Sequence, residues 1–80
     1  MIEHAEAKKN AEGKIRVLIF QEKIDKSWKK AVFDKAELIG VKGKKEWKVT
    51  FINEQGVKGK KLYIFLKQDG AFIAANFTGK

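Results

Sequence analysis

Lysine is the residue type with which this sequence is best equipped to act on another molecule, and its lysines are concentrated. The pentapeptide Val41-Lys42-Gly43-Lys44-Lys45 recurs identically as Val57-Lys58-Gly59-Lys60-Lys61, sixteen residues later. Residues 41–61 hold seven lysines and two glutamates, a net +5 out of a formal +8 for the whole chain. Clustered ammonium groups attract polyanions and accelerate their encounter with a protein. The charge pattern therefore predicts binding to nucleic acid or to an acidic protein partner.

Aromatic residues follow each lysine cluster, because Trp47 and Tyr63 occupy the second position of the next apolar stretch. Base–aromatic stacking contributes about 1–3 kcal/mol per base, and lysines beside the rings hold phosphates as point charges without reading sequence. We therefore expect single-stranded DNA or RNA to bind with little sequence preference and strong salt dependence. The predicted nucleic-acid-binding residues are Lys42, Lys44, Lys45, Lys48, Lys58, Lys60, Lys61, Tyr63, Phe65, Lys67 and Phe72.

Other interpretations of the same residues remain open. Val-Lys-Gly-Lys-Lys is an ordinary turn sequence, and lysines protect sheet edges against aggregation. The rings of Tyr63, Phe65 and Phe72 also suit a second core, and Trp28 and Trp47 suit anchoring in a core better than stacking on a ligand. The alternative function is a small interaction or inhibitor module, of phage or plasmid type, that binds an acidic protein with an aromatic face or an edge strand. An edge strand would also permit a homo-oligomer, and attachment to anionic lipid is a weaker third interpretation.

Residues for catalysis are sparse, so we expect a protein that is not an enzyme and uses no cofactor. The only histidine, His4, lies near the N-terminus, and the carboxylates form no recognisable pair or metal-ligand motif. Gly40 to Lys45 lacks the spacing of a phosphate-binding loop and the Ser or Thr that should follow it. With no cysteine, disulfides and thiolate zinc sites are excluded.

The same absence of cysteine favours a cytoplasmic protein. The longest apolar runs are far shorter than the roughly 20 residues that span a bilayer. Residues 1–7 lack the basic start and apolar stretch of a secretion signal, so we expect the protein to stay inside the cell.

The residues after Lys14 read as strands, because β-branched and aromatic stretches alternate with glycine, lysine and polar clusters. Residues 1–13 form a separate appendage in this interpretation, either a short helix or a mobile tail, and residues 14–80 form a single β domain. Residues 34–40 fit a short helix equally well, with Asp34 as N-cap and Gly40 as the stop. The expected strands span Lys14–Ile24, Trp28–Phe33, Ala36–Val41, Lys45–Ile52, Lys61–Gln68 and Ala71–Thr78.

Asp69-Gly70 is the clearest turn signal, because this dipeptide tolerates the two positive φ angles of a type I′ hairpin. A two-residue loop pairs Lys67 with Phe72 and Phe65 with Ala74. Alternation then creates one apolar face for the core: Leu62, Ile64, Leu66, Ile73, Ala75 and Phe77. The opposite face holds the aromatic and basic residues: Tyr63, Phe65, Lys67, Phe72, Ala74 and Asn76.

The predicted fold class is all-β, with a five- or six-stranded antiparallel sheet that curls or closes into a small SH3-like or oligonucleotide-binding barrel. The stretch from Ile15 to Phe20 is apolar on both faces, and burial on both faces suits a closed sheet. In an antiparallel meander the two lysine clusters lie at opposite ends of the sheet, about 20 Å apart.

Overall fold

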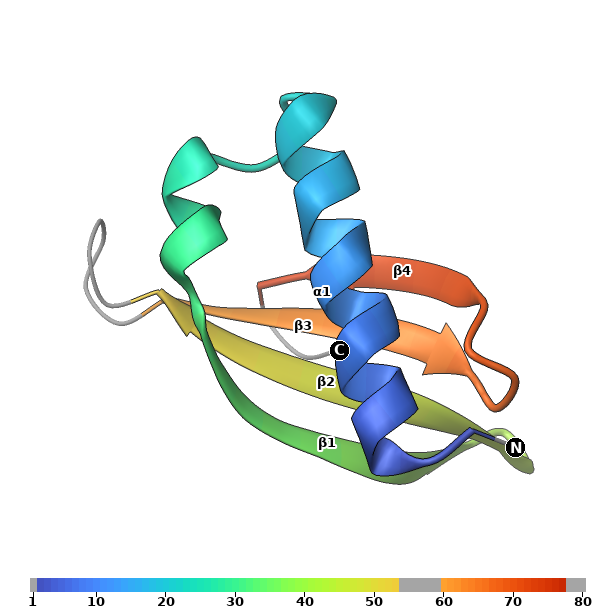
Figure 1. The fold of residues 1–80 in the computed structure, drawn as a ribbon. Coiled ribbons are helices and arrows are strands. Elements are labelled where there is room, and N and C mark those ends of the chain that lie inside the picture. Colours follow the sequence, from blue (N-terminus) through green and yellow to red (C-terminus); the bar gives the residue numbers. More distant parts are fainter. Residues whose placement is uncertain (1, 54–59, 78–80) are drawn as a thin grey trace.

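A computed structural model of the chain describes residues 2–53 and 60–77. A long helix comes first, followed by a short 3-10 helix and four strands (Figure 1). Their bounds are α1 His4–Phe20, η1 Lys26–Lys30, β1 Val32–Val41, β2 Lys44–Asn53, β3 Lys60–Lys67 and β4 Phe72–Asn76.

The N-terminal helix extends further than the sequence predicted. Its buried stripe has helical spacing, with four side chains that are at most 7% exposed: Ala7, Ala11, Ile15 and Leu18. The strand expected from Lys14 is therefore wrong, because Ile15 and Leu18 continue a stripe that begins with two alanines. The helix ends in a Schellman motif, in which Glu22 adopts a φ of 59° and the N–H of Lys23 donates to the Leu18 carbonyl at 2.9 Å.

The second expected strand, from Trp28, is also wrong for most of its length. The Asp25 carboxylate accepts a hydrogen bond from the Ser27 backbone N–H at 3.0 Å and caps η1 instead. This short helix inserts Trp28 into the core, where its side chain is 5% exposed. The core role expected for both tryptophans is thereby confirmed, since Trp47 is 2% exposed.

Residues 34–40 belong to β1, so the helical alternative for them is wrong and the strand expected over Ala36–Val41 is confirmed. β1 pairs with β2 along its length, with a bulge between Phe33 and Lys35. The connection is a two-residue turn in which Lys42 and Gly43 both have positive φ, 49° and 80°. Positive φ at both central residues defines a type I′ turn, whose twist matches that of the strands.

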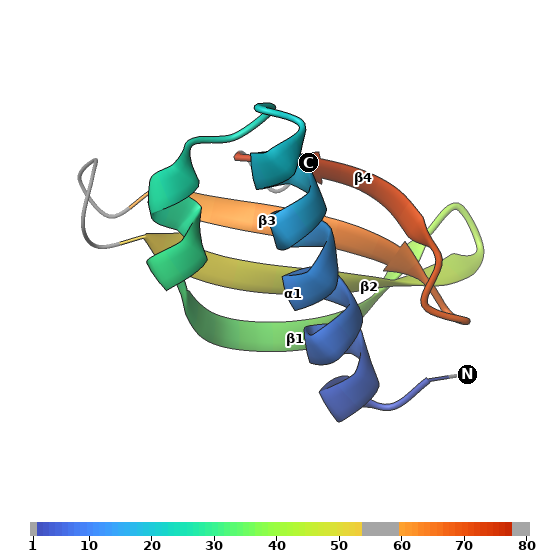
Figure 2. The same ribbon diagram turned by 45° about the horizontal axis from the view of Figure 1, so that its top comes forward.

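The sheet is an antiparallel meander in the order β1-β2-β3-β4, and it is open. An antiparallel, mostly β architecture is confirmed, whereas five or six strands and a closed barrel are wrong. The reason lies in the N-terminal third of the chain, where both expected strands are helical. Four strands are too few to close the sheet, and α1 and η1 cover one face of it instead (Figures 1 and 2).

The β3–β4 hairpin departs from the expected register at its turn end. The Lys67 carbonyl accepts from the Gly70 N–H at 2.9 Å, and the Lys67 N–H donates to the Ala71 carbonyl at 2.7 Å. Only Gly70 has a positive φ, 96°, so the loop has three residues rather than the two of a type I′ turn. This loop makes Leu66 face Phe72, and a bulge between Leu66 and Phe65 then returns the pairing to the expected register. The expected pairs of Tyr63, Ile64 and Phe65 with Asn76, Ala75 and Ala74 are confirmed.

The core lies between α1 and one face of the sheet, which we call the covered face. Its strand residues follow from the register: Phe33, Ala36, Leu38, Trp47, Val49, Phe51, Leu62, Ile64, Leu66, Phe72 and Ala75. Ile73 and Phe77 were predicted to be core residues but are 38% and 48% exposed. For Ile73 the bulge is the reason, because it displaces this residue from regular alternation.

Candidate binding surface

The opposite side of the sheet has no helix over it among the described residues (Figure 2). We call it the uncovered face. Strand alternation assigns to it Val32, Lys35, Glu37, Ile39, Glu46, Lys48, Thr50, Ile52, Lys61, Tyr63, Phe65, Lys67, Ala74 and Asn76. This face mixes four lysines and two glutamates with apolar side chains, whereas a solvated sheet face is normally polar.

The centre of the uncovered face is shielded by its own long side chains. Lys48 places its Nζ 4.7 Å from the centroid of the Tyr63 ring, a cation–π contact between β2 and β3. Their cross-strand partners are buried: Thr50, opposite Tyr63, is 1% exposed, and Phe65, opposite Lys48, is 8% exposed. The Thr50 Oγ1 has no hydrogen-bond partner among the described residues. The centre of the uncovered face therefore combines a buried ring and a buried hydroxyl with a cation–π contact beside them.

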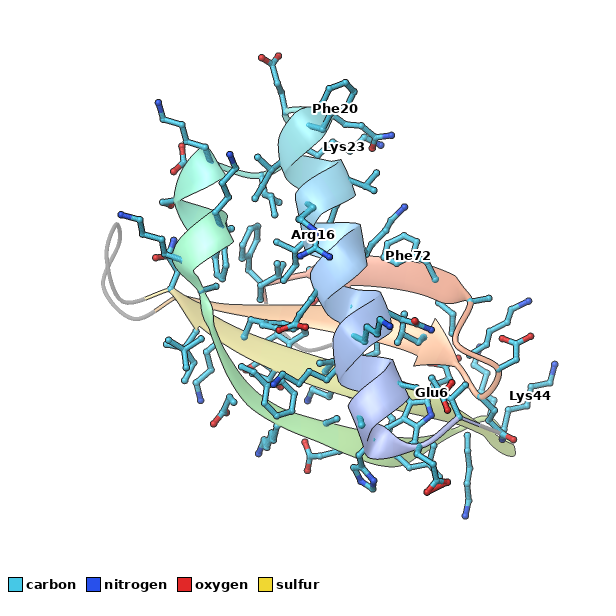
Figure 3. The ribbon with its side chains drawn as sticks, in the orientation of Figure 1. Glu6, Arg16, Phe20, Lys23, Lys44 and Phe72 are labelled. Atoms are coloured by element: carbon cyan, nitrogen blue, oxygen red, sulfur yellow. The ribbon has the colours of Figure 1, made fainter. Side chains whose placement is uncertain are left out.

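Four of the predicted lysines gather at one end of the sheet, where the β1–β2 and β3–β4 turns lie together. Lys42, Lys44, Lys45 and Lys67 are all exposed there, and Figure 3 shows Lys44 at this end. The two turns border an open hollow of about 570 Å³, lined by Gly43, Lys44, Lys45, Glu46, Lys67, Gln68, Asp69 and Ile73. Glu46 and Asp69 offset part of the lysine charge in this hollow.

Lysines of the second pentapeptide mark the other end of the sheet. Lys61 is exposed and pairs with Ile52, eight positions along β2 from Lys44. At 3.3 Å per residue this places the two backbone positions about 26 Å apart. Lys60 begins β3, but its side chain and the whole of Lys58 lie outside the described residues.

The three aromatic residues predicted to share one face do not share it. Tyr63 and Phe65 lie on the uncovered face, but Phe65 is almost fully buried. Phe72 lies on the covered side, because the three-residue loop pairs it with Leu66, and Lys14 of α1 places its Nζ 4.3 Å from the Phe72 ring centroid. The uncovered face thus offers one partly exposed ring, Tyr63, rather than a platform of three.

Other charged groups on and near the sheet are sparsely paired. Lys35 and Glu37 on β1 form an exposed ion pair at 3.7 Å. At the start of η1, hydrogen bonds from the Ser27 hydroxyl, and next from the Ser27 backbone N–H, hold the pKa of Asp25 below its usual value of 3.8. His4 begins α1 and lies edge-on against the Trp47 ring at 4.6 Å, so its expected position in a mobile tail is wrong.

Within the described part of the chain, no three His, Asp or Glu side chains are grouped closely enough to hold a metal ion. The helices of residues 2–53 are also too short or too polar to traverse a bilayer.

Sequence reasoning overlooked the isoleucines of the uncovered face. Ile39 and Ile52 are partly exposed there, and Val32 is 55% exposed. The sequence shows that Ile39 and Ile52 directly follow Leu38 and Phe51 and so lie on the other face. Because a closed barrel was expected to bury residues on both faces, these isoleucines were not predicted to be exposed. In an open sheet the same residues become a surface feature.

The chain matches, over residues 1–80, the family described as "Family of unknown function (DUF6488)", and it belongs to that family. No curated protein and no solved structure matches it.

Proposed function

We propose that this protein is a non-catalytic binding domain that recognises an acidic protein partner with the uncovered face of its sheet. The observation that carries the proposal is a sheet face that bears partly exposed apolar side chains and lysines and that neither α1 nor η1 covers. Exposed apolar side chains among polar ones are typical of interaction sites. The partner's acidic character follows from the chain's formal charge of +8.

The contact between Lys48 and Tyr63 gives this face a way to bind an acidic surface. The two side chains lie over the buried Thr50 and Phe65, and their positions flank the centre of the sheet. A partner carboxylate can replace the Tyr63 ring as the neighbour of the Lys48 ammonium, which leaves the ring free for an apolar contact. Lysine stems cover apolar surface while their charged heads stay in water, so the face is soluble when unoccupied.

Binding of this kind combines two contributions that respond differently to salt. Lysine fields accelerate association and are screened at a Debye length of about 8 Å in physiological salt. Burial of Ile39, Ile52 and Tyr63 is insensitive to that screening. We therefore expect binding that weakens as salt rises but does not vanish.

A labelled random copolymer of glutamate and tyrosine is a suitable probe, with polyglutamate as the charge-only control. We expect the copolymer to stay bound, by fluorescence anisotropy, when salt is raised from about 50 to about 300 mM, and polyglutamate to dissociate. Lys48→Glu should weaken copolymer binding about tenfold, or roughly 1.4 kcal/mol, because it reverses a charge at the centre of the surface.

Lys30→Glu is the matched control, since Lys30 is an exposed lysine of η1 on the other side of the sheet. Both variants change the net charge equally, so a purely global charge effect moves them together. Equal losses in Lys48→Glu and Lys30→Glu contradict the proposed surface, provided that both variants keep the wild-type circular dichroism spectrum.

Single-stranded nucleic acid is the second candidate, favoured by the placement of exposed lysines at both ends of the sheet. Its stacking component depends on Tyr63, the one partly exposed ring of the uncovered face. An oligothymidylate of about fifteen nucleotides should then bind with a steep salt dependence, and Lys44→Glu and Tyr63→Ala should each weaken it. Stronger binding of the oligonucleotide than of the copolymer at about 150 mM salt would reverse the order of the two candidates.

The cytoplasmic location predicted from the cysteine-free composition belongs to the same proposal. A cytoplasmic location is compatible with either an acidic protein or a nucleic acid as the ligand.

A further inference from the structure

The two edges of the sheet differ in how they are protected. β1 carries Asp34, Lys35 and Glu37 and has a bulge near its start, and charges and bulges on an edge oppose pairing with another chain. β4 has the sequence Phe-Ile-Ala-Ala-Asn, without a charged residue. Its bulge lies at the Phe72 end, and its pairing with β3 is regular from Ala74 onward. β4 pairs with β3 alone among the described strands.

One side of α1 stands next to β4. The Asn10 side chain donates a hydrogen bond to the Gly70 carbonyl at 3.4 Å, and Lys14 lies over the Phe72 ring. Val17 follows one turn later on the same side of the helix, because residues three and four apart share a side. Figure 3 shows Phe72 beside the helix, with Phe20 at its C-terminal end.

Large apolar side chains are exposed along this border between α1 and β4. Val17 is 42% exposed, Phe72 39% and Ile73 38%, and Phe20 at the end of α1 is 87% exposed. These side chains lie next to the part of β4 from Phe72 to Ala75, which pairs with β3 alone among the described strands. An extended segment that pairs with β4 would supply hydrogen bonds to the backbone of this strand, and its alternate side chains would cover the exposed apolar side chains.

The charges around this border select the kind of segment that fits. Residues 14–20 of α1 read Lys-Ile-Arg-Val-Leu-Ile-Phe and contain two bases and no acid. Lys67, at the end of β3, is exposed near the other side of β4. A second copy of this chain brings another net charge of +8 and is disfavoured by repulsion. An acidic segment is favoured by the same charges.

We propose that the β4 edge accepts an extended, acidic polypeptide segment as a fifth strand. Alternate side chains of the segment are apolar and point toward α1, where they contact Val17 and Phe72. The acidic side chains between them point to the opposite side, toward Lys67 and Ala74. This site goes beyond the proposed function, because it uses the edge of the sheet rather than its uncovered face and binds independently of it.

A synthetic peptide of about eight residues that alternates valine with glutamate tests the proposal. The readout is the methyl spectrum of protein labelled at isoleucine and valine. We expect the peptide to shift the Ile73 and Val17 methyl signals and to leave those of Ile39 and Ile52, on the uncovered face, in place. The same peptide with alternate backbone nitrogens methylated keeps its charge but cannot pair as a strand, and we expect at least tenfold weaker binding.

Val17→Asp removes an apolar contact and adds a like charge for the peptide, so it should weaken binding at least fivefold. Val32→Asp, at another exposed valine, on the β1 edge, is the control and should change binding less than twofold. The melting temperature of each variant reports whether it folds. If Val17→Asp does not fold, Phe72→Ser replaces it and tests the same border from the β4 side.

Four results with the peptide overturn the proposal, and a fifth, given last, comes from an oligothymidylate. The four are no methyl shift at millimolar peptide, undiminished binding of the N-methylated peptide, equal losses in the two valine variants, and shifts confined to Ile39 and Ile52. The last outcome supports the proposed function while removing the edge site. Conversely, loss of copolymer binding to the uncovered face, with the Ile73 shifts retained, removes the proposed function and leaves the edge site intact. Shifts of Ile73 caused more strongly by an oligothymidylate than by the peptide also overturn the choice of a polypeptide.

Discussion

The two faces of this sheet are built by the same strands, yet they bury their side chains to very different degrees. On the covered face, six apolar side chains of β2 and β3 are at most 2% exposed: Trp47, Val49, Phe51, Leu62, Ile64 and Leu66. Among the described side chains of the uncovered face only Thr50 and Phe65 are less than a tenth exposed, and their cross-strand partners are Tyr63 and Lys48. We infer that stability resides in the covered face and that the uncovered face is held ready for a partner.

Adjacent residues of β2 give the largest expected difference between the faces. Phe51 points into the core, 2% exposed and edge-on to the Phe33 ring at 5.9 Å, whereas Ile52 points to the uncovered face and is partly exposed. Phe51→Ala should lower the free energy of unfolding by about 3–5 kcal/mol. Ile52→Ala should lower it by about 1 kcal/mol, because less of its area is buried. Urea denaturation measures both changes.

Phe51→Leu is the milder variant to use if Phe51→Ala does not fold in a domain of this size. The comparison breaks if Ile52→Ala is as destabilising as Phe51→Ala, since the uncovered face would then behave as a second core.

The two turns at one end of the sheet extend the comparison to the loops. Gly70 has a φ of 96°, and a Cβ on it would collide with the Asn10 side chain of α1, whereas Gly43 has a φ of 80° and open space around it. Gly70→Ala should therefore destabilise by more than the roughly 1–2 kcal/mol of left-handed strain that Gly43→Ala introduces. Thermal unfolding of the two variants compares them. Equal shifts would mean that α1 does not pack against the β3–β4 turn.

Thr50 sharpens the description of the uncovered face. Its hydroxyl is buried and has no hydrogen-bond partner among the described residues. Thr50→Val preserves shape and removes the desolvated hydroxyl, so we expect stability to stay level or to rise by about 1 kcal/mol. A loss above that size in chemical denaturation would show that the hydroxyl is satisfied in solution.

The smallest expected effect lies at the junction of η1 and β2. Ser27 lowers the pKa of Asp25, and its hydroxyl also accepts from the Asn53 side chain at 2.8 Å. Because the folded-state pKa is depressed, the carboxylate favours folding above its unfolded pKa, and this contribution is lost as pH falls through the folded value. A carboxyl-detected NMR titration should give Asp25 a pKa below 3.8, and Ser27→Ala should raise it. An unchanged titration in Ser27→Ala contradicts the assignment of the cause.

The sequence allowed prediction of the sheet better than of the helices. β2 and β3 alternate strictly between Trp47 and Leu66, so their strands and inward residues could be read directly. The helical stripe of α1 was hidden, because two of its buried members are alanines and its last turns are rich in β-branched residues. Packing against the sheet overrides that local preference.

The sequence allowed us to predict on which face the strand lysines lie, but not on which face all three aromatic rings lie. Lys48 and Tyr63 share a face because both follow simple alternation. Phe72 changed sides because the loop has three residues and β4 contains a bulge, and a one-residue shift in a strand exchanges its faces. Asp69-Gly70 is compatible with both loop lengths, so the sequence alone does not choose between them.

The most direct test of the central claim is an isoleucine methyl spectrum recorded while the glutamate–tyrosine copolymer is added. The account predicts that Ile39 and Ile52 on the uncovered face shift or broaden, while Ile15 and Ile64 in the core keep their positions. Unmoved signals from Ile39 and Ile52 under conditions where the copolymer binds would contradict it.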